Sequence, residues 1–413
     1  MSALLTEAAA LLPELQTLRR SLHADPEVGL DLPRTQARVL DALEGLDLEV
    51  STGVGTTSVV AVLRGTHPDK PANAPSVILR GDMDALPVDE LTDEPFKSVN
   101  GAMHACGHDL HTAGLVGAAR LLHAHRGDLA GDVVLMFQPG EEGWNGASVM
   151  IAEGVLDAAG SRAIAAFGAH VHMGARGVVS TKPGTLQAGS NVLHVTIHGR
   201  GGHGSQPQSA VDPVPALAEL VTALQNMVSR RINAFDPIAL SVTQLKAGEA
   251  VNVIPASASL GATVRTLSQE SLDIVRAQSK QLARGIAEAH GCTAEVDFAV
   301  QYPVTINDDA ETAWTLDEVR GLLGPDRVEV SAQPIMPSED FSFVLQEVPG
   351  TYMMLGAKRT DVPEERQGDN HSPFVVFDDS VLGDQAALLA HLAIERLRSA
   401  VSAHDAAEVA PAV

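Results

Sequence analysis

The chain has 413 residues, of which 45% are hydrophobic and 19% are charged, and its formal net charge at pH 7 is −24. The length favours two domains, and the composition is typical of a globular protein with large cores. The acidic balance argues against nucleic acids and anionic membrane surfaces as partners, because a phosphate backbone requires a basic protein face.

The N-terminal segment predicts an amphipathic helix. Apolar residues recur at helical spacing through residues 4–18, and Glu7 interrupts the run, so a helix is favoured over a signal peptide. No window reaches the uninterrupted apolar length of a membrane span. Cys106 and Cys292 are the only cysteines, which does not suggest a secreted disulfide scaffold. We therefore expect a cytoplasmic protein.

The first 180 residues alternate short apolar runs with helical patterns. Strands are predicted at residues 58–65, 76–82, 132–142 and 163–172, and helices at residues 33–46 and 111–125. This alternation predicts an α/β domain whose mixed, largely parallel sheet is flanked by helices. Three of the strands end in polar pairs: Asp82 with Asp84, Glu141 with Glu142, and His170 with His172. Ligands bind at this edge of open α/β sheets.

The pattern changes at about residue 186. The predicted order becomes strand 190–199, helix 212–231, strands 237–248 and 251–267, helix 268–291 and strand 293–302. This βαββαβ order is that of a ferredoxin-like α+β unit. Mixed patterns then return and end in a helix over residues 383–399. We predict a discontinuous domain of residues 1–185 and 303–413, with residues 186–302 inserted as a second domain.

The stretch MHACGHDLH, residues 103–111, concentrates chemically active side chains. Cys106 and His108 are two residues apart on a turn before a helical pattern, so their thiolate and imidazole can share Zn²⁺ or a related ion. A cysteine nucleophile would instead need a general base, for which His108 or His111 is available. A buried cysteine beside helix-capping residues is a third interpretation. The stretch alone does not distinguish these three interpretations.

Residues elsewhere favour the metal. Glu141 and Glu142 directly follow an apolar strand, where one carboxylate can bind a cation while the other moves protons. Asp84 can bind a metal or orient a ligand imidazole. Each of these residues alone is commonly a solvated or hydrogen-bonded group. Together with His170 and His371 they supply enough donors for two ions that share a bridge.

A glycine-rich loop in the inserted domain, HGRGGHGSQP, contains His203. Glycines let the backbone and an imidazole approach a ligand closely. A hairpin turn with an incidental histidine explains the same residues equally well.

Several stretches resemble the metal-dependent aminoacylase/carboxypeptidase family, and most closely its N-acyl-amino-acid amidohydrolase branch, which includes hippurate hydrolases and indole-acetyl-amino-acid hydrolases. From Arg19 to Phe377 they occur in the family's order: RRSLHADPEVG, LRGDMDALP, MHACGHDLHTA, FQPGEEGWNGA, GAHV, GRGGHGSQP, NVIP, GATVRT, SEDFSF and HSPFVVF. The sequence departs from the branch at Gln208, where a second histidine is usual, and at Leu32 and Pro33, where acidic residues are common.

The resemblance implies a di-zinc exopeptidase-like catalytic domain with two divalent ions per subunit, which can be Zn, Mn, Co or Ni. The ligands it implies are Cys106, His108, Glu142, His170 and His371, with Cys106 as the bridge. It also implies that Glu141 is the general base and that Asp84 orients and polarises the site.

The resemblance further implies that the inserted domain forms a homodimer interface and closes over the substrate. His203 would then reach the partner subunit's site and stabilise the oxyanion. Asn252 and Arg265 match positions near the substrate, and an arginine suits a carboxylate by geometry.

The implied reaction is hydrolysis of the amide bond of N-acyl-L-amino acids such as N-acetyl or N-benzoyl derivatives. A dipeptidase, carboxypeptidase or desuccinylase would use the same dinuclear site. Two other classes stay open, namely a thiol hydrolase with Cys106 as nucleophile and a non-catalytic protein that binds metal or peptide. Glu141 argues mildly against the last class, since a pure binding protein has no need of a general base.

Overall fold

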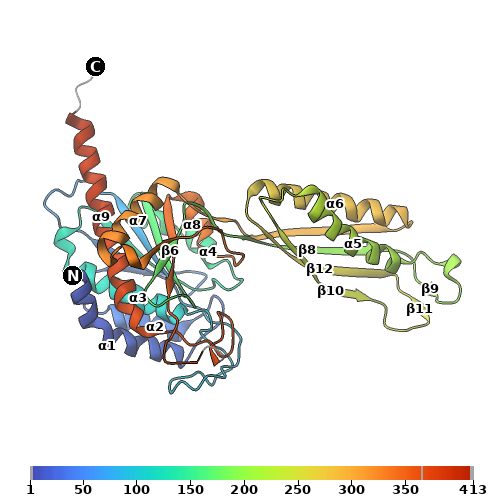
Figure 1. Ribbon diagram of the computed structural model, residues 1–413, viewed down its shortest axis with the longest axis horizontal. Helices are drawn as coiled ribbons and strands as arrows, with labels where there is room; N and C mark the ends of the chain where they lie inside the picture. The colour runs from blue at the N-terminus through green and yellow to red at the C-terminus, as the bar shows by residue number, and fades with distance from the viewer. Residues whose placement is uncertain (1–2, 364–365, 410–413) are drawn as a thin grey trace. The chain divides into compact units, whose positions relative to one another are not determined.

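The computed structural model describes residues 3–363 and 366–409, with side chains as far as Ser402 (Figure 1). The chain divides into two compact units. Unit 1 comprises the described residues of 1–184, 306–332 and 343–413, and unit 2 comprises residues 185–305 and 333–342. Residues 333–342, which the sequence prediction leaves in the discontinuous domain, group with unit 2.

Unit 1 is built on an eight-stranded sheet. Its spatial order is β1 (Glu49–Thr52), β2 (Val59–Arg64), β4 (Asp132–Gln138), β3 (Ser76–Asp82), β5 (Ala165–His172), β16 (Gly350–Gly356), β6 (Val179–Thr181) and β15 (Val328–Val330). The central strands β4, β3, β5 and β16 run parallel, whereas β2 and β6 are antiparallel to their inner neighbours. Every residue of β3, β4 and β16 is buried, as expected where helices cover both faces of a parallel sheet. The predicted mixed, largely parallel sheet is confirmed.

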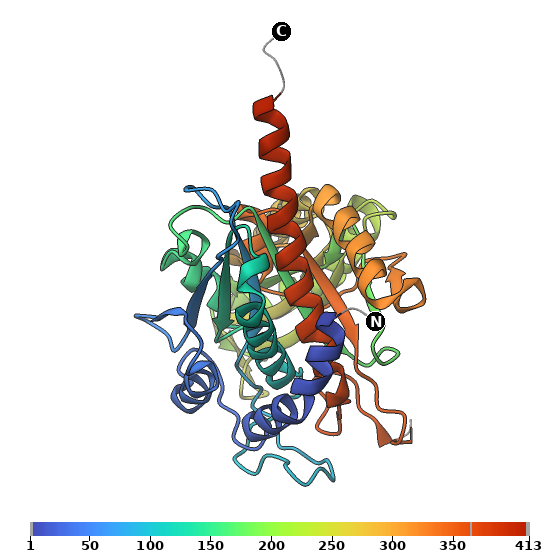
Figure 2. The same cartoon turned by 90° about the vertical axis from the view of Figure 1, so that its left-hand side faces the viewer.

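Helices flank this sheet. They are α1 (Ala3–His23), α2 (Pro33–Leu43), α3 (His108–Ala124), α4 (Gly146–Ala152), α7 (Asp309–Leu323), α8 (Ser342–Glu347) and α9 (Leu382–Val409). Figure 2 shows α1, α3 and α9 side by side, and α3 and α9 lie against β3 and β5. Gly117 permits the close approach of α9, because a Cβ there would lie 2.8 Å from that of Ala386. Among the described residues, no helix combines the length and apolar character needed to cross a bilayer.

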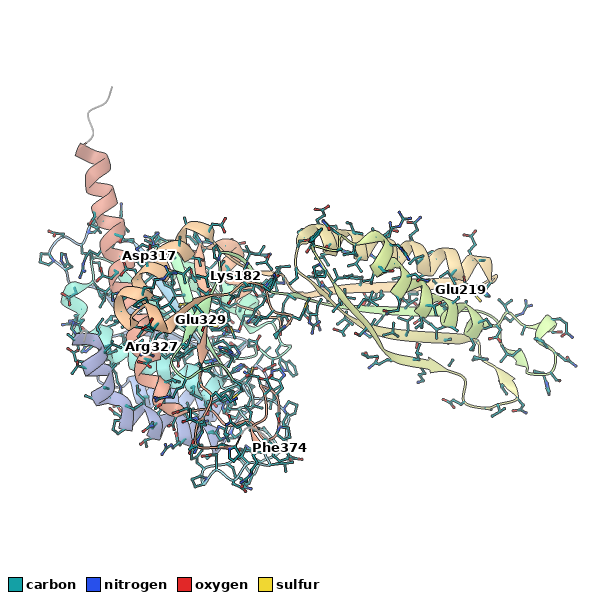
Figure 3. All side chains as sticks on the ribbon, in the orientation of Figure 1. Lys182, Glu219, Asp317, Arg327, Glu329 and Phe374 are labelled. Carbon is teal, nitrogen blue, oxygen red and sulfur yellow. The ribbon has the colours of Figure 1, made fainter. Side chains whose placement is uncertain are left out.

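Unit 2 contains a four-stranded antiparallel sheet and two helices. The chain order is β8 (Gly189–His198), α5 (Pro213–Arg231), β10 (Ala239–Ala247), β12 (Ser257–Thr266), α6 (Gln269–Ala289) and β13 (Thr293–Tyr302), and the spatial order is β10-β12-β8-β13. Leu193, Val195 and Ile197 alternate along β8 and are buried in the core that α5 and α6 cover. Glu219, labelled in Figure 3, lies on α5, and its carboxylate is 2.8 Å from the ring of His290, the C-cap residue of α6. The predicted βαββαβ order is confirmed.

One predicted strand in unit 2 is wrong. The sequence predicts a single strand over residues 251–267, but the structure has β11 (Val253–Ile254) and β12 (Ser257–Thr266). Pro255 lies between them, and proline cannot donate to a ladder in the middle of a sheet. β11 pairs instead with β9 (Gly202–His203), and β7 (Gly184–Gln187) pairs with β14 (Thr305–Asn307).

Candidate metal centre

The candidate site lies at the carboxyl ends of the central strands of unit 1. β3 ends at Asp82, and Asp84 follows it; the loop after β4 carries Glu141 and Glu142, and β5 carries His170 near its end. The three strands are parallel neighbours, so these ends meet at one edge of the sheet. This is the edge at which open α/β sheets bind ligands.

The turn before α3 brings Cys106 and His108 to the same edge. Gly107 is the N-cap of α3 and has a φ of 86°, in the left-handed region. A Cβ at this position would lie 2.3 Å from Cγ2 of Val171. Only glycine meets both requirements without strain, which gives the Cys-Gly-His spacing a physical cause.

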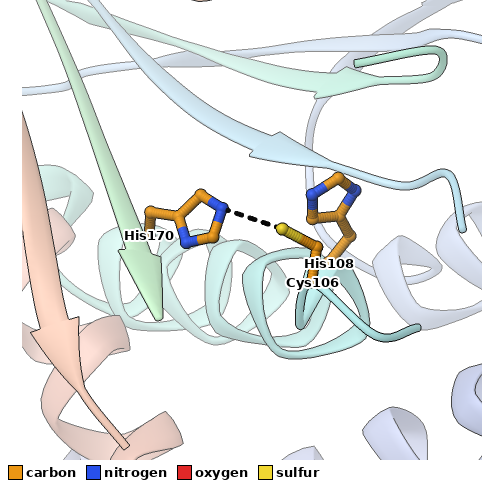
Figure 4. A group of neighbouring side chains, drawn as sticks. All are labelled: Cys106, His108 and His170. Carbon is orange, nitrogen blue, oxygen red and sulfur yellow. Dashed lines mark hydrogen bonds between the residues drawn. The ribbon is translucent and has the colours of Figure 1, made fainter. Parts of the chain in front are cut away.

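Two groups of donor atoms overlap at Cys106. One is Cys106, His108 and His170, the other is Cys106, Glu142 and His371, and the donor atoms within each group lie within 4.8 Å of one another. The Cys106 sulfur is 3.4 Å from Nε2 of His170 and 3.3 Å from Nε2 of His371. Figure 4 shows the His170 ring directed at this sulfur, with His108 beside it. The structure therefore brings all five predicted ligands into one cluster.

Backbone carbonyls determine which nitrogen each buried imidazole presents to the cluster. Nδ1 of His170 lies 2.7 Å from the carbonyl oxygen of Val171, and Nδ1 of His108 lies 2.9 Å from that of Asp84. A carbonyl oxygen only accepts, so both Nδ1 atoms carry a proton and donate it. Nε2 of each ring is left for a ligand.

Two buried atoms of the cluster fit a cation. Within the described part of the chain, Nε2 of His108 is buried and has no hydrogen-bond partner, and the buried Oε1 of Glu142 lies 3.2 Å from Nε2 of His371. An unpartnered buried polar atom costs about 1–3 kcal/mol, which a bound cation would offset. A thiolate, imidazoles and one carboxylate suit Zn, Mn, Co or Ni better than Mg or Ca.

Negative charge dominates the surroundings of two of the histidines. Hydrogen bonds from His371 to the Cys106 thiol and the Glu142 carboxylate raise the pKa of His371 to about 10. Burial lowers the pKa of His108, but the carboxylate of Asp82, 3.5 Å away, together with Asp84 and Cys106, outweighs burial and raises that pKa well above its ordinary value. A positive charge is therefore favoured here, and a metal cation would take the place of these protons.

Asp84 holds the loop that carries both glutamates. Its two carboxylate oxygens each accept a backbone N–H, one from Glu141 and one from Glu142, both at 3.0 Å. The side chain of Glu141 is buried, and its Oε2 lies 4.0 Å from Nε2 of His108. Glu141 thus lies beside the donor cluster but outside the two groups that share Cys106.

A second set of hydrogen bonds connects residues next to the donor cluster. Asp82 accepts from Nη1 of Arg80 and from Nδ1 of His111, both at 2.6 Å. The backbone N–H of Val171 donates to Nε2 of His111 at 2.8 Å, and Asn370 donates to the Val171 carbonyl at 3.2 Å. Sequence reasoning missed Arg80 and Asn370. The charge of Arg80 inside an apolar strand was a usable signal, whereas Asn370 offered none.

The remaining predicted residues lie in unit 2. His203 pairs with Val253 in the β9–β11 ladder, and Gly204 donates its backbone N–H to the Asn252 carbonyl at 2.8 Å. His203 and Asn252 therefore share one exposed loop pair. Arg265 lies at the other end of β12 from this loop pair, half-buried, with Nη1 donating to Thr263 at 2.8 Å. His203 and Asn252 therefore lie together in unit 2, whereas Arg265 lies apart from both.

Comparison with known proteins gives consistent matches over nearly the whole chain. The model of peptidase family M20/M25/M40 matches residues 78–395. IAA-amino acid hydrolase ILR1-like 5 of Arabidopsis thaliana is 35% identical, covering 95% of this chain and 88% of that protein. Thermostable carboxypeptidase 2 of Saccharolobus solfataricus is 36% identical, covering 92% and 94%. Hippurate hydrolase of Campylobacter jejuni is 34% identical, covering 96% and 100%.

A solved structure agrees with these matches. A dinuclear metal-binding peptidase of Bacillus subtilis from the same family superposes with a TM-score of 0.80 at 30% identity, covering 94% of this chain and 99% of that chain.

Proposed function

This chain belongs to peptidase family M20/M25/M40, and we propose that it hydrolyses the amide bond of N-acyl-L-amino acids to a carboxylic acid and a free amino acid. The overlap of two donor groups at Cys106 carries the proposal. Relatives named as hippurate and IAA-amino acid hydrolases support this substrate class.

Two divalent cations per subunit would bind at these groups. Cys106, His108 and His170 would hold one, and Cys106, Glu142 and His371 the other, so that both donor sets would include the Cys106 sulfur. When bound, the cations lower the pKa of a water molecule in the site and polarise the carbonyl of the substrate. The mixed sulfur, nitrogen and oxygen donors are compatible with Zn, Mn, Co or Ni.

Glu141 would act as the general base. Its carboxylate accepts a proton from the attacking water, the water oxygen bonds to the amide carbon, and Glu141 passes the proton to the nitrogen as the C–N bond breaks. The buried position of Glu141 beside His108 supports this role. Asp84 would keep it there, because Asp84 binds the backbone N–H of Glu141.

Unit 2 would supply substrate contacts and the interface of a homodimer. His203 would stabilise the oxyanion in the site of the partner subunit, and its exposure on a loop pair with Asn252 supports this role. Asn252 and Arg265 would bind the substrate, whose carboxylate suits a guanidinium. Cys106 and Cys292 are both free thiols, which suits a reducing compartment, so we place the enzyme in the cytoplasm.

Metal analysis and hydrolysis assays test the proposal together. Purified protein should contain two divalent ions per chain and hydrolyse hippurate or acetyl-methionine until a chelator removes the metal. Glu141→Gln should keep the metal but lose about 10²–10⁴-fold in turnover, the usual contribution of a general base. Glu288→Gln, an exposed substitution on α6, is the matched control and should keep full activity.

Two other results would overturn the assignment. Activity that resists chelation but is blocked by iodoacetamide would identify Cys106 as a nucleophile. Cleavage of dipeptides in preference to N-acyl amino acids would favour a carboxypeptidase, which the name of the 36% identical relative makes the second candidate.

A further inference from the structure

His203 has an unusual local partner in the loop that follows it. The backbone N–H of Ser205 donates to Nδ1 of the His203 ring at 3.1 Å, and the Ser205 hydroxyl oxygen lies 2.9 Å from the same nitrogen. Both groups belong to the glycine-rich stretch of unit 2, and both residues are exposed.

A backbone N–H only donates, so Nδ1 of His203 must present its lone pair. In a neutral imidazole the proton then lies on Nε2. We infer that Ser205 is a positioning residue that fixes the Nε2–H tautomer of His203 and thereby makes this ring a hydrogen-bond donor. The inference rests on the proposed function for the use to which the donor is put, namely binding the oxyanion.

The backbone around the ring is already fixed by other contacts. His203 pairs with Val253, and its carbonyl accepts the N–H of Gln206 at 2.8 Å. A Cβ on Gly204 would lie 3.1 Å from the carbonyl carbon of Asn252, a tight contact that glycine avoids. Rotation of the His203 side chain is the remaining freedom, and Ser205 restrains it by binding Nδ1.

The tautomer decides whether His203 helps or hinders the reaction. An N–H aimed at the oxygen stabilises the negative charge that develops there. The opposite tautomer would place the Nε2 lone pair against that charge and repel it. A residue that selects the tautomer therefore changes turnover without contacting the substrate.

Two substitutions remove the donors in steps. Ser205→Ala deletes the hydroxyl and keeps the backbone N–H, whereas Ser205→Pro deletes both. Nitrogen-15 NMR of histidine-labelled protein above pH 8, with His203→Gln to assign the signal, reports which nitrogen carries the proton. We expect Nε2–H in the wild type and a mixture of tautomers in Ser205→Pro.

Kinetics complete the test. Ser205→Ala should lower kcat about 3–10-fold with KM within twofold, and Ser205→Pro should approach the roughly 10²–10³-fold loss typical of a missing oxyanion donor. Ser205→Thr, which keeps both donors, should restore turnover, and Ser229→Ala on α5 should change nothing.

Two results would overturn the inference, namely an Nδ1–H signal in the wild type or unchanged tautomer and turnover in folded Ser205→Pro. If Ser205→Pro does not fold, an unchanged kcat in Ser205→Ala would overturn the inference instead. Wild-type protein that shows the Nε2–H signal but hydrolyses no acyl amino acid would instead contradict the proposed function alone.

Discussion

Replacing Asp109 with asparagine should destabilise unit 1 by about 3–5 kcal/mol, because it removes the buried carboxylate that Arg19 and His23 share. Asp109 Oδ2 lies 2.7 Å from Nε of Arg19 and 2.8 Å from Nδ1 of His23, and Nε2 of His23 lies 3.2 Å from Glu90. All four side chains are buried. They join α1 and the segment after β3 to the first turn of α3, which carries His108.

Asp109 is ionised in this cluster. Burial raises its pKa, but the charges of Arg19 and His23 outweigh burial and hold the pKa well below its ordinary value. An asparagine would leave the Arg19 charge to Asp379, 3.8 Å from its Nη1, and the His23 ring to Glu90. An unfolding entropy of about 2.1 cal/mol/K per residue gives roughly 0.6 kcal/mol/K for a unit of this size, so Tm should fall by roughly 5–8 °C.

Thermal unfolding of chelated protein measures this change without a contribution from bound metal. Asp25→Asn is the matched control, because Asp25 binds Arg34 and Arg38 at 2.9 and 2.8 Å while all three side chains remain about a third or more exposed. An exposed pair of this kind contributes about 0–1 kcal/mol. A fall in Tm for Asp109→Asn no larger than that of Asp25→Asn would refute the reasoning.

Three further substitutions probe the metal centre. Cys106→Ser should lower metal content below two ions per chain in elemental analysis, and full occupancy would contradict the bridging role. Gly107→Ala should weaken metal binding and stability because its Cβ would lie 2.3 Å from Val171 Cγ2, whereas Gly127→Ala, whose Cβ would contact nothing within 4 Å, should be neutral in both assays. Asn370→Ala should weaken metal binding about 10-fold in chelator competition, since residues that support ligands typically contribute 10–100-fold; unchanged affinity would show that its bond to Val171 is dispensable.

The fold was largely predictable because its elements carry strong local patterns. The uninterrupted apolar runs of β3 and β4 indicate strands buried on both faces, and the structure buries every residue of both. In β8 the alternation of Leu193, Val195 and Ile197 with exposed or half-buried positions indicates a sheet covered on one face. The prediction of one strand over residues 251–267 was wrong for a local reason. Apolar residues lie on both sides of Pro255, so the hydropathy pattern does not indicate that the strand is divided there.

The candidate site was predictable only where donors follow a recognisable element. Glu141 follows one predicted strand and His170 lies near the end of another. Because strands alternate with helices in this part of the sequence, the ends of these strands can be expected to meet at one edge of a parallel sheet. The partners of these residues could not be found in this way. Asn370 donates to the Val171 carbonyl although the two residues are 199 positions apart in the sequence. The hydrogen bond from Gly204 to Asn252 depends on the β9–β11 pairing, which no local sequence pattern specifies.

Contacts that the sequence does not predict determine which ring nitrogen of each histidine carries the proton. His108 and His170 present an Nε2 lone pair because a backbone carbonyl accepts from Nδ1 in each ring. His203 presents Nε2 with its proton because a backbone N–H donates to Nδ1 instead. The same ring atom would therefore be a ligand for a cation in unit 1 and a hydrogen-bond donor in unit 2. Backbone groups cannot exchange these roles as side chains can, so the local fold, rather than the residue type, assigns the chemistry of each imidazole.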